Sequence, residues 1–431
     1  MVSRWRPYSS CLHIAARKQR GVALLLAVLM ALGLLAGMLA IGFAGDLARQ
    51  NQRKERTTEA LAQAKEALIG WSVQRTPSIP LPNARPGEIP CPDNNNDGFE
   101  DGTCVAGALG RMPWKTLGIP EPRDGAGETL WYAVAGPFRI WTVNSNPINS
   151  DTKGNITVYS GSSSTVMTLE AVAVIFAPGA VLGAQDRSCT VGVNCTATGQ
   201  CTTSPASLTP KCNPTNYLDP TGGGNNATTN GPYISAQASN TFNDRLLVIT
   251  TDSLMTPVEQ RVAREMLKLL QLYKANSGCN CYPWPDLSTG FSDFGLNRGR
   301  IPGYDLGATS PPYALPVDWG VGGAPPFPQW FIDNGWRRII YYAVGRNFLE
   351  SSGAGCTSCE TGQTTLSVNN VPGTEVVMLT PGPAGAGRPV AYPWTNWVPY
   401  LEDPENNNNS DDHYEIPSSS GYSRDRLFTI P

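Results

Sequence analysis

The N-terminal 44 residues constrain this chain more than any other segment. A leader without acidic residues ends at Gly21 and carries Arg4, Arg6, Arg17, Lys18 and Arg20. An apolar run of about 23 residues, 22–44, follows it directly. A helix needs about 20 apolar residues to cross a bilayer, whereas a secretory signal core has about 7–15. The pattern predicts one membrane-spanning helix over 22–44, with the leader 1–21 held in the cytoplasm by its positive charge.

The helical pattern does not end with the apolar run. From Asp46 to Trp71 the chain is rich in Ala, Leu, Gln, Glu, Lys and Arg and contains no proline, a composition that favours helix. Leu61, Ala64, Leu68 and Trp71 fall on one stripe. We therefore expect 45–76 to continue the same helix as an amphipathic stem. Within the apolar run, Gly33 and Gly37 offer a small face on which another helix can pack closely.

A basic leader that ends in glycine, an apolar helix and an amphipathic continuation together resemble the type IV pilin and pseudopilin superfamily. The resemblance covers residues 17–71 and implies that prepilin peptidase cleaves after Gly21 and methylates Val22. The family's usual glutamate at the fifth mature position is replaced here by Leu26. Such a start is similar to the K-type minor pseudopilin of type II secretion, which is proposed to cap the pseudopilus tip.

The resemblance implies a structural role in assembly at or near the tip of a type II secretion pseudopilus or a type IV pilus. Its expected partners are other pilin or pseudopilin subunits, bound through the N-terminal helix, and prepilin peptidase. It also implies a single-pass protein of the bacterial inner membrane with a periplasmic C-terminal domain. Two other interpretations of the N-terminus are an unprocessed signal anchor and signal peptidase cleavage near Ala44.

Composition limits the remaining classes of fold and partner. With 44 Gly and 37 Pro in 431 residues, the chain is too rich in loops for a helical bundle, and two β-containing modules fit it better. The net charge of −3, with no dense basic cluster after the leader, gives no basis for binding nucleic acid.

A series of sequence landmarks occurs twice in the same order, as expected for a repeated module. The segment Gly110-Arg111-Met112-Pro113 matches Gly299-Arg300-Ile301-Pro302, Trp131-Tyr132-Ala133-Val134 matches Tyr341-Tyr342-Ala343-Val344, and Asp244-Arg245-Leu246 matches Asp425-Arg426-Leu427. A second helix is expected from a capping box at Thr256, with Pro257 at its first position and Glu259 two residues later.

The fold class that follows is α+β. It consists of a long N-terminal membrane-spanning helix and two tandem pilin-like modules, 77–255 and 256–431. In each module one helix is expected to pack across an antiparallel sheet.

The cysteine count favours disulfides. Of the eleven cysteines, Cys11 lies in the leader, so processing would leave ten, an even number that suits an oxidising compartment. Spacing suggests Cys91 with Cys104, pairing among Cys189, Cys195, Cys201 and Cys212, and links between Cys279 or Cys281 and Cys356 or Cys359. The last four thiols also allow a tetrahedral zinc site.

The segment 93–101 resembles the start of a calcium-binding loop, because oxygen-bearing side chains alternate and glycine stands at the sixth position. The predicted ligands are the side chains of Asp93, Asn95 and Asp97, the carbonyl of Phe99, and Asp101 directly or through water. The twelfth position is Cys104, so the usual bidentate glutamate is absent, and Glu100 is a less well placed substitute. The alternative is a surface turn rich in Asn and Asp.

Catalytic motifs are scarce, and the chain is expected not to be an enzyme. After processing, His413 is the only histidine, and it lies in the polar stretch 403–415. No phosphate-binding loop, metalloprotease helix or nucleophile elbow is present, although a carboxylate pair for glycan cleavage stays open. Five tryptophans suit either a core or a sugar-binding surface: Trp319, Trp330, Trp336, Trp394 and Trp397. The alternatives are thus a pilin-stem-displayed adhesin or glycan-binding protein, and a membrane-anchored hydrolase.

Overall fold

We analysed a computed structural model of the chain. It describes residues 16–75, 84–102, 104–140, 147–161, 165–192, 195–201, 210–221, 224–285, 297–301, 328–351, 358–361, 364–383, 400–408, 411–417 and 424–431. The chain divides into two compact units, Met1–Thr58 and Glu59–Pro431. The five-part division expected from the sequence remains a prediction.

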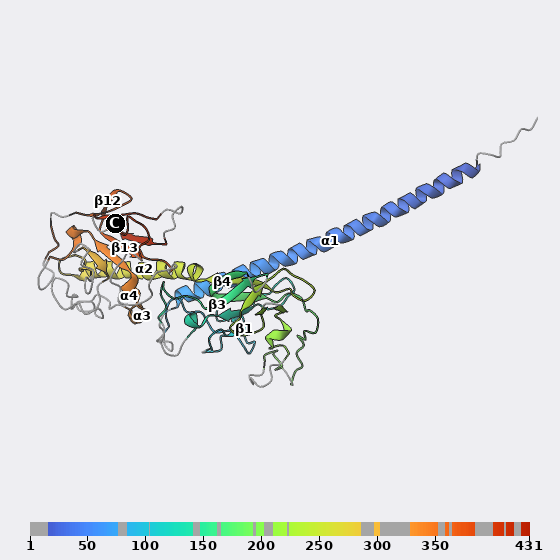
Figure 1. Cartoon of the computed structure of the whole chain (residues 1–431), viewed down its shortest axis with the longest axis horizontal. Helices are drawn as coiled ribbons and strands as arrows, with labels where there is room; N and C mark the ends of the chain where they lie inside the picture. Colours follow the sequence, from blue (N-terminus) through green and yellow to red (C-terminus); the bar gives the residue numbers. More distant parts are fainter. Residues whose placement is uncertain are drawn as a thin grey trace, which may run out of the picture. The chain divides into compact units, whose positions relative to one another are not determined.

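One helix accounts for the described part of the first unit. Helix α1, Ala16–Gln74, has 59 residues and continues into the second unit (Figure 1). Proline is absent from α1, which is otherwise built from good helix formers, so nothing in its sequence breaks the backbone ladder. Beyond the apolar run its exposed face is charged, and Arg49 pairs with Asp46 one turn earlier at 3.6 Å.

The membrane assignment is wrong for the described residues. None of their helices is long and apolar enough to cross a membrane. This finding overturns the membrane-spanning helix 22–44, the fold class built on it and the single-pass inner-membrane location. The pilin description loses the support that a membrane helix would have given it.

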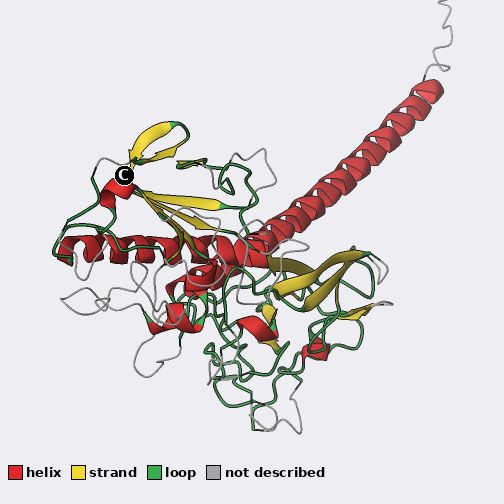
Figure 2. Cartoon of the chain, turned by 60° about the vertical axis from the view of Figure 1, so that its left-hand side comes forward, coloured by secondary structure: helices red, strands yellow, loops and turns green. Residues whose placement is uncertain are grey.

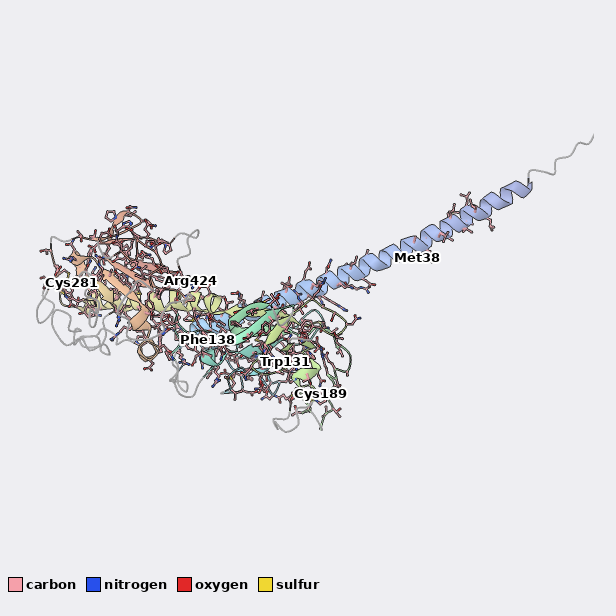
Figure 3. The ribbon with its side chains drawn as sticks, in the orientation of Figure 1. Met38, Trp131, Phe138, Cys189, Cys281 and Arg424 are labelled. Carbon is pink, nitrogen blue, oxygen red and sulfur yellow. A yellow bond between two sulfur atoms is a disulfide. The ribbon has the colours of Figure 1, made fainter. Side chains whose placement is uncertain are left out.

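The first half of the larger unit contains a six-stranded sheet. Its strands are β1 (Leu109–Arg111), β2 (Trp131–Val134), β3 (Ile156–Ser160), β4 (Val166–Ala177), β7 (Tyr233–Ser235) and β8 (Arg245–Thr250). The order is β1-β2-β4-β3-β7, with β8 also paired to β4, and only β3 and β7 run parallel. The 3-10 turns η1 (Gly136–Phe138) and η2 (Pro214–Asn216) and the short hairpin of β5 (Pro220–Thr221) and β6 (Gly224–Asn225) complete this half. Trp131 and Phe138 lie in its core (Figure 3).

The second half contains two further sheets. Strands β9 (Arg298–Arg300), β10 (Tyr341–Val344), β13 (Val376–Thr380) and β15 (Arg426–Ile430) form an antiparallel sheet in the order β15-β13-β10-β9. A smaller sheet has the order β12-β11-β14, from β11 (Leu366–Val368), β12 (Val371–Thr374) and β14 (His413–Tyr414). The short helices α3 (Gln329–Asp333) and α4 (Trp336–Ile339) and the turn η4 (Arg346–Phe348) lie between these strands in the sequence.

Helix α2, Thr251–Asn276, contacts β13 and β15 of the second sheet and β4 and β8 of the first, and Figures 1 and 2 show it beside the second sheet. Apolar residues at helical spacing form a stripe along it that is buried: Val258, Val262, Met266, Leu269, Leu270 and Tyr273. The helix begins earlier than the sequence suggested, because Thr250 and Ser253 form the capping box. Pro257 therefore lies inside the helix, not at its first position.

Four strands of the first sheet, in the order β1-β2-β4-β8, match the order and antiparallel pairing of β9-β10-β13-β15 in the second. In the first half Gly110 pairs with Tyr132, which pairs with Ile175. In the second half Gly299 pairs with Tyr342, which pairs with Met378.

The contacts of the two central tyrosines also match. The hydroxyl of Tyr132 donates to the carbonyl of Pro90, and that of Tyr342 donates to the carbonyl of Pro283. The matched sequence landmarks thus occupy equivalent places in two sheets. The central strands β2 and β10 are buried along their whole length, so both of their faces require apolar or satisfied side chains.

Candidate functional site

The longest run of exposed large apolar side chains in the described residues lies on α1. Every side chain from position 24 to position 38 is exposed. Met38, for example, has 69% of its surface exposed (Figure 3). The large members of this surface are Leu24, Leu25, Leu26, Val28, Leu29, Met30, Leu32, Leu34, Leu35 and Met38. An apolar patch of this extent usually marks a binding surface. We call it the stem surface.

Two glycines shape the stem surface. A Cβ atom added at Gly33 or Gly37 would meet no atom within 4 Å apart from its neighbours in the chain and the adjoining helix backbone. Another helix can therefore approach the α1 backbone closely at these positions. The predicted processing residues Gly21 and Val22 lie within α1, and their side-chain surroundings lie outside the described residues. Cleavage and methylation there stay predictions.

The predicted calcium loop is built around the buried carboxylate of Asp93. That carboxylate accepts the backbone N–H groups of Asn96 at 2.6 Å, Asp97 at 3.2 Å and Gly98 at 2.8 Å. Asn96 and Gly98 have positive φ, which closes the tight turn. The disulfide between Cys91 and Cys104 spans the loop. The backbone thus wraps around one acidic side chain.

The other proposed ligands bond mainly to their own turn. The Asp97 carboxylate accepts the Phe99 N–H at 2.7 Å, and that of Asp101 accepts the Asn94 N–H at 2.6 Å. Asn95 donates from its amide to Asp97 at 3.2 Å. Among the described residues, no three His, Cys, Asp or Glu side chains gather as a metal site. Calcium binding at Asp93, Asn95, Asp97, Phe99 and Asp101 therefore stays a prediction.

One electrostatic feature does suit a cation in this loop. Burial raises the pKa of Asp93 to about 6, against the hydrogen bonds from Gly98 and Asn96, and the charges of Asp97 and Asp101 raise it further. A calcium ion would offset this repulsion.

We expect calcium to raise the melting temperature of the parent chain by several degrees and to leave that of an Asp93→Ala/Asp97→Ala variant unchanged. Calorimetry with calcium and with chelator measures both. Identical parent melting curves in the two conditions would contradict calcium binding, and Asp186→Ala, an exposed acid outside the loop, is the control.

The structure forms four disulfides among the described cysteines: Cys91–Cys104, Cys189–Cys195, Cys201–Cys212 and Cys281–Cys359. All four agree with the pairings that spacing suggested. Cys279 is also disulfide-bonded, and Cys356 lies outside the described residues. The zinc alternative is wrong, because Cys281 and Cys359 bond to each other and cannot both act as thiolate ligands.

The only histidine of the described residues has a serine neighbour. Ser367 Oγ lies 3.1 Å from His413 Nδ1. The Ser367 N–H donates to the Asp412 carbonyl at 2.9 Å, so it is not available to stabilise an oxyanion. This pair therefore lacks that part of an acyl-transfer site. Trp330 and Trp336 are buried in the core, whereas Trp319, Trp394 and Trp397 lie outside the described residues.

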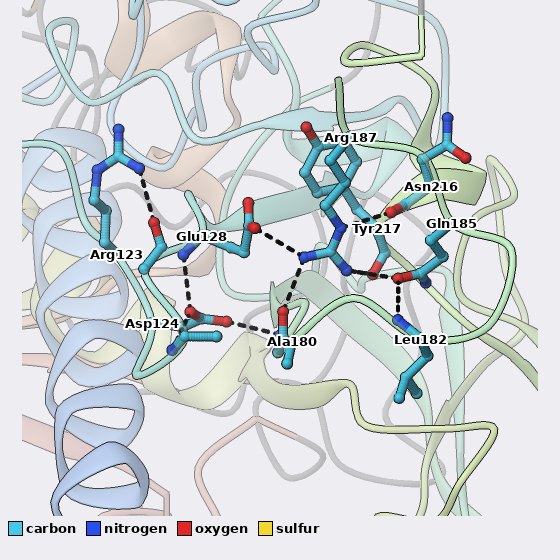
Figure 4. A network of polar contacts seen from close by, with 12 residues as sticks. Arg123, Asp124, Glu128, Ala180, Leu182, Gln185, Arg187, Asn216 and Tyr217 are labelled. Carbon is cyan, nitrogen blue, oxygen red and sulfur yellow. Dashed lines mark hydrogen bonds and ion pairs between the residues drawn. The ribbon is translucent and has the colours of Figure 1, made fainter. Parts of the chain in front are cut away.

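A polar network in the first half has the character of a structural clamp (Figure 4). The largely buried Arg187 pairs with Glu128 at 3.1 Å and lies 4.7 Å from the ring centre of Tyr217. It also donates to the carbonyls of Gly179 at 2.9 Å and Asn216 at 2.7 Å. Through these contacts the Arg187 guanidinium holds the segment after β4 in place. We therefore assign Arg187 a structural role and not a ligand-binding one.

The two halves of the larger unit meet through buried polar contacts that the sequence analysis did not predict. The side-chain oxygen of Asn334, from the second half, accepts the Ile148 N–H at 2.8 Å and a hydrogen bond from the Arg85 guanidinium at 3.3 Å. The fully buried carboxylate of Glu259 on α2 accepts bonds from Ser150 of the first half and from Arg426 of the second. Only the folded chain brings these residues together.

No protein-family model, no curated protein and no solved structure matches this chain.

Proposed function

We propose that this chain is a non-enzymatic subunit of a helix-built assembly, of the type that its resemblance to pilins and pseudopilins implies. The stem surface is the observation that carries the proposal. Burying one leucine or valine side chain stabilises by about 1.5–3 kcal/mol, and the stem surface exposes a continuous set of such side chains. Packing against helices of other subunits would remove this surface from water.

Further sequence features support the pilin-like form of the proposal. Gly33 and Gly37 leave open space for a partner helix. Processing after Gly21 would place Val22 at the start of the packing helix, and Leu26 replaces the glutamate that other subunits of the family use. Together with the added second half, this favours a minor or tip position in a type II secretion pseudopilus or a type IV pilus.

The described residues give less support to the other functions. Trp330 and Trp336 serve the core and are unavailable for stacking on a sugar. The Ser367 and His413 pair lacks the serine's own N–H as an oxyanion donor. We therefore propose an assembly role over glycan binding or hydrolysis.

The test compares the self-association of the full chain with that of Gly33→Leu/Gly37→Leu. These substitutions keep the stem surface apolar and favour helix, but they add side chains where a partner helix would approach. We expect sedimentation velocity to show association of the parent and at least tenfold weaker association of the variant. Mass spectrometry of the same proteins, produced with and without prepilin peptidase, is expected to show methylated Val22 only with the enzyme.

The matched control is Gly45→Leu, because this position is equally open but lies beyond the apolar run. It is expected to associate like the parent. A parent that stays monomeric, or a Gly33→Leu/Gly37→Leu variant that associates as strongly as the parent, would contradict specific helix packing. The second result would instead indicate unspecific apolar contact.

A further inference from the structure

His413 lies among acidic groups in the second half of the chain. It pairs across strands β11 and β14 with Ser367, whose hydroxyl is 3.1 Å from Nδ1. Its other ring nitrogen, Nε2, is 3.6 Å from a carboxylate oxygen of Glu415 and 3.9 Å from one of Glu405. The histidine side chain is 15% exposed, so two carboxylates face one largely buried imidazole.

The backbone around this cluster is fixed by an asparagine. The Asn406 amide donates to the Glu415 carbonyl at 3.0 Å and accepts the Glu415 N–H at 2.9 Å. These two bonds hold the loop that carries Glu405 against the end of β14. The position of Glu405 beside His413 therefore follows from an ordered backbone.

The first half of the chain repeats this backbone without the charges. Asn226 donates to the Ile234 carbonyl at 3.1 Å and accepts the Ile234 N–H at 2.8 Å. The buried Tyr233 before Ile234 pairs in parallel with Val158, as the buried Tyr414 before Glu415 pairs with Val368.

This equivalence places Pro232, Ile234 and Asn225 where the second half has His413, Glu415 and Glu405. None of the three residues of the first half carries an ionisable side chain. The two backbone hydrogen bonds of the asparagine thus form in the first half without a histidine or a glutamate. The charged residues of the second half are therefore not needed for these bonds.

Histidine changes its charge between about pH 5 and pH 8. Whichever nitrogen holds the proton in the neutral ring, a second proton adds a full positive charge beside two carboxylates. The opposite charges then attract at these distances. Without that charge, the two carboxylates repel each other.

The other charged groups nearby are engaged elsewhere. The carboxylate of Asp412 binds Arg298 at 2.8 Å and Thr364 at 2.8 Å. The carboxylate of Asp411 accepts the backbone N–H of His413 at 3.2 Å and the side-chain amide of Asn408 at 3.3 Å. At the far end of the loop, Asp425 accepts the N–H groups of Glu402 and Asp403, each at 3.0 Å.

We propose that His413, Glu405 and Glu415 form a proton-dependent clasp, which fastens the loop 403–408 to strand β14 in mildly acidic solution and loosens it as the pH rises. This proposal is independent of the assembly role proposed above. It concerns a local property of the second half, and its failure would leave the stem surface unaffected.

The test is hydrogen exchange of the full chain at pH 5.5 and pH 8.0, in the presence of chelator and corrected for the intrinsic effect of pH. We expect the amides of 405–408 and 411–415 to be about fivefold better protected at pH 5.5, the size expected of two partly exposed ion pairs. The amides of 226–234 provide an internal control with little change. His413→Gln is expected to remove the difference at 405–408 and 411–415.

A second variant, Glu405→Gln/Glu415→Gln, keeps the imidazole and is expected to remove the same difference, so the test does not depend on one substitution folding well. Asp425→Asn is expected to keep it, and this variant separates the clasp from Asp425, whose pKa burial raises to about 6. Equal protection of the parent at both pH values would overturn the clasp, as would a His413→Gln variant that retains the difference. Protection that appears only without chelator would point to a metal ion instead and would also overturn it.

Discussion

Replacing Arg426 by methionine is expected to lower the free energy of unfolding by about 3 kcal/mol, because the substitution leaves the Glu259 carboxylate buried without its cation. Glu259 is fully buried. Its other partners are the hydroxyls of Ser150 and of Thr380, the latter at 3.3 Å. The guanidinium of Arg426 also donates to Thr256 at 2.6 Å.

Equilibrium urea denaturation measures this effect, and a double-mutant cycle separates the pair from its neighbours. The double variant Glu259→Met/Arg426→Met is expected to recover most of the loss, because no unpaired charge remains buried. Arg245→Met is the matched control, since Arg245 occupies the equivalent place on β8 but is exposed. A loss as large in Arg245→Met as in Arg426→Met would show that the Glu259 pair is not the cause.

As the pH rises from 4 to 7, the free energy of unfolding of Asp425→Asn is expected to rise by about 3 kcal/mol relative to that of the parent. Burial raises the pKa of Asp425 to about 6, against the hydrogen bonds from Glu402 and Asp403. The folded chain therefore holds a proton that the unfolded chain has already released. The stability from this proton is present below about pH 4 and is lost as the pH rises through about 6. A shift of two pKa units corresponds to about 3 kcal/mol.

Denaturant unfolding of the parent and of Asp425→Asn across this pH range provides the measurement. Other buried acids, such as Asp93 and Asp244, are common to both proteins and cancel in the comparison. Asp186→Asn serves as the control, because Asp186 is fully exposed and its pKa is lowered, first by its hydrogen bond with Ser188. Parallel stability curves for the parent and Asp425→Asn would contradict the assigned shift.

The helices and strands with strong local patterns were predictable. The stripe of α2 and the residues Leu61, Ala64 and Leu68 of α1 are buried, since helical periodicity alone decides which face is apolar. The paired landmarks around Tyr132 and Tyr342 fall on equivalent strands. Disulfides between cysteines close in sequence, such as Cys91 with Cys104, could also be predicted, because short spacing restricts the possible partners.

Other predictions failed where local sequence competes with its surroundings. Thr256 resembles a helix start, but strand β8 runs directly into α2 and Thr250 takes the capping position. A membrane crossing was expected from hydropathy, but the described helices do not support it. Four thiols suggested zinc, but tertiary contact brought Cys281 and Cys359 together as a disulfide.

The sequence by itself determined the periodic helices, the order of the repeated landmarks and the apolar character of the stem surface, because these depend on neighbours along the chain. Only the tertiary structure decided which charges are buried together. Glu259 and Arg426 are far apart in the sequence, as are Ser367 and His413, and each pair meets through sheet and helix packing. The energy of such contacts depends on desolvation and distance, and neither is fixed until the chain has folded.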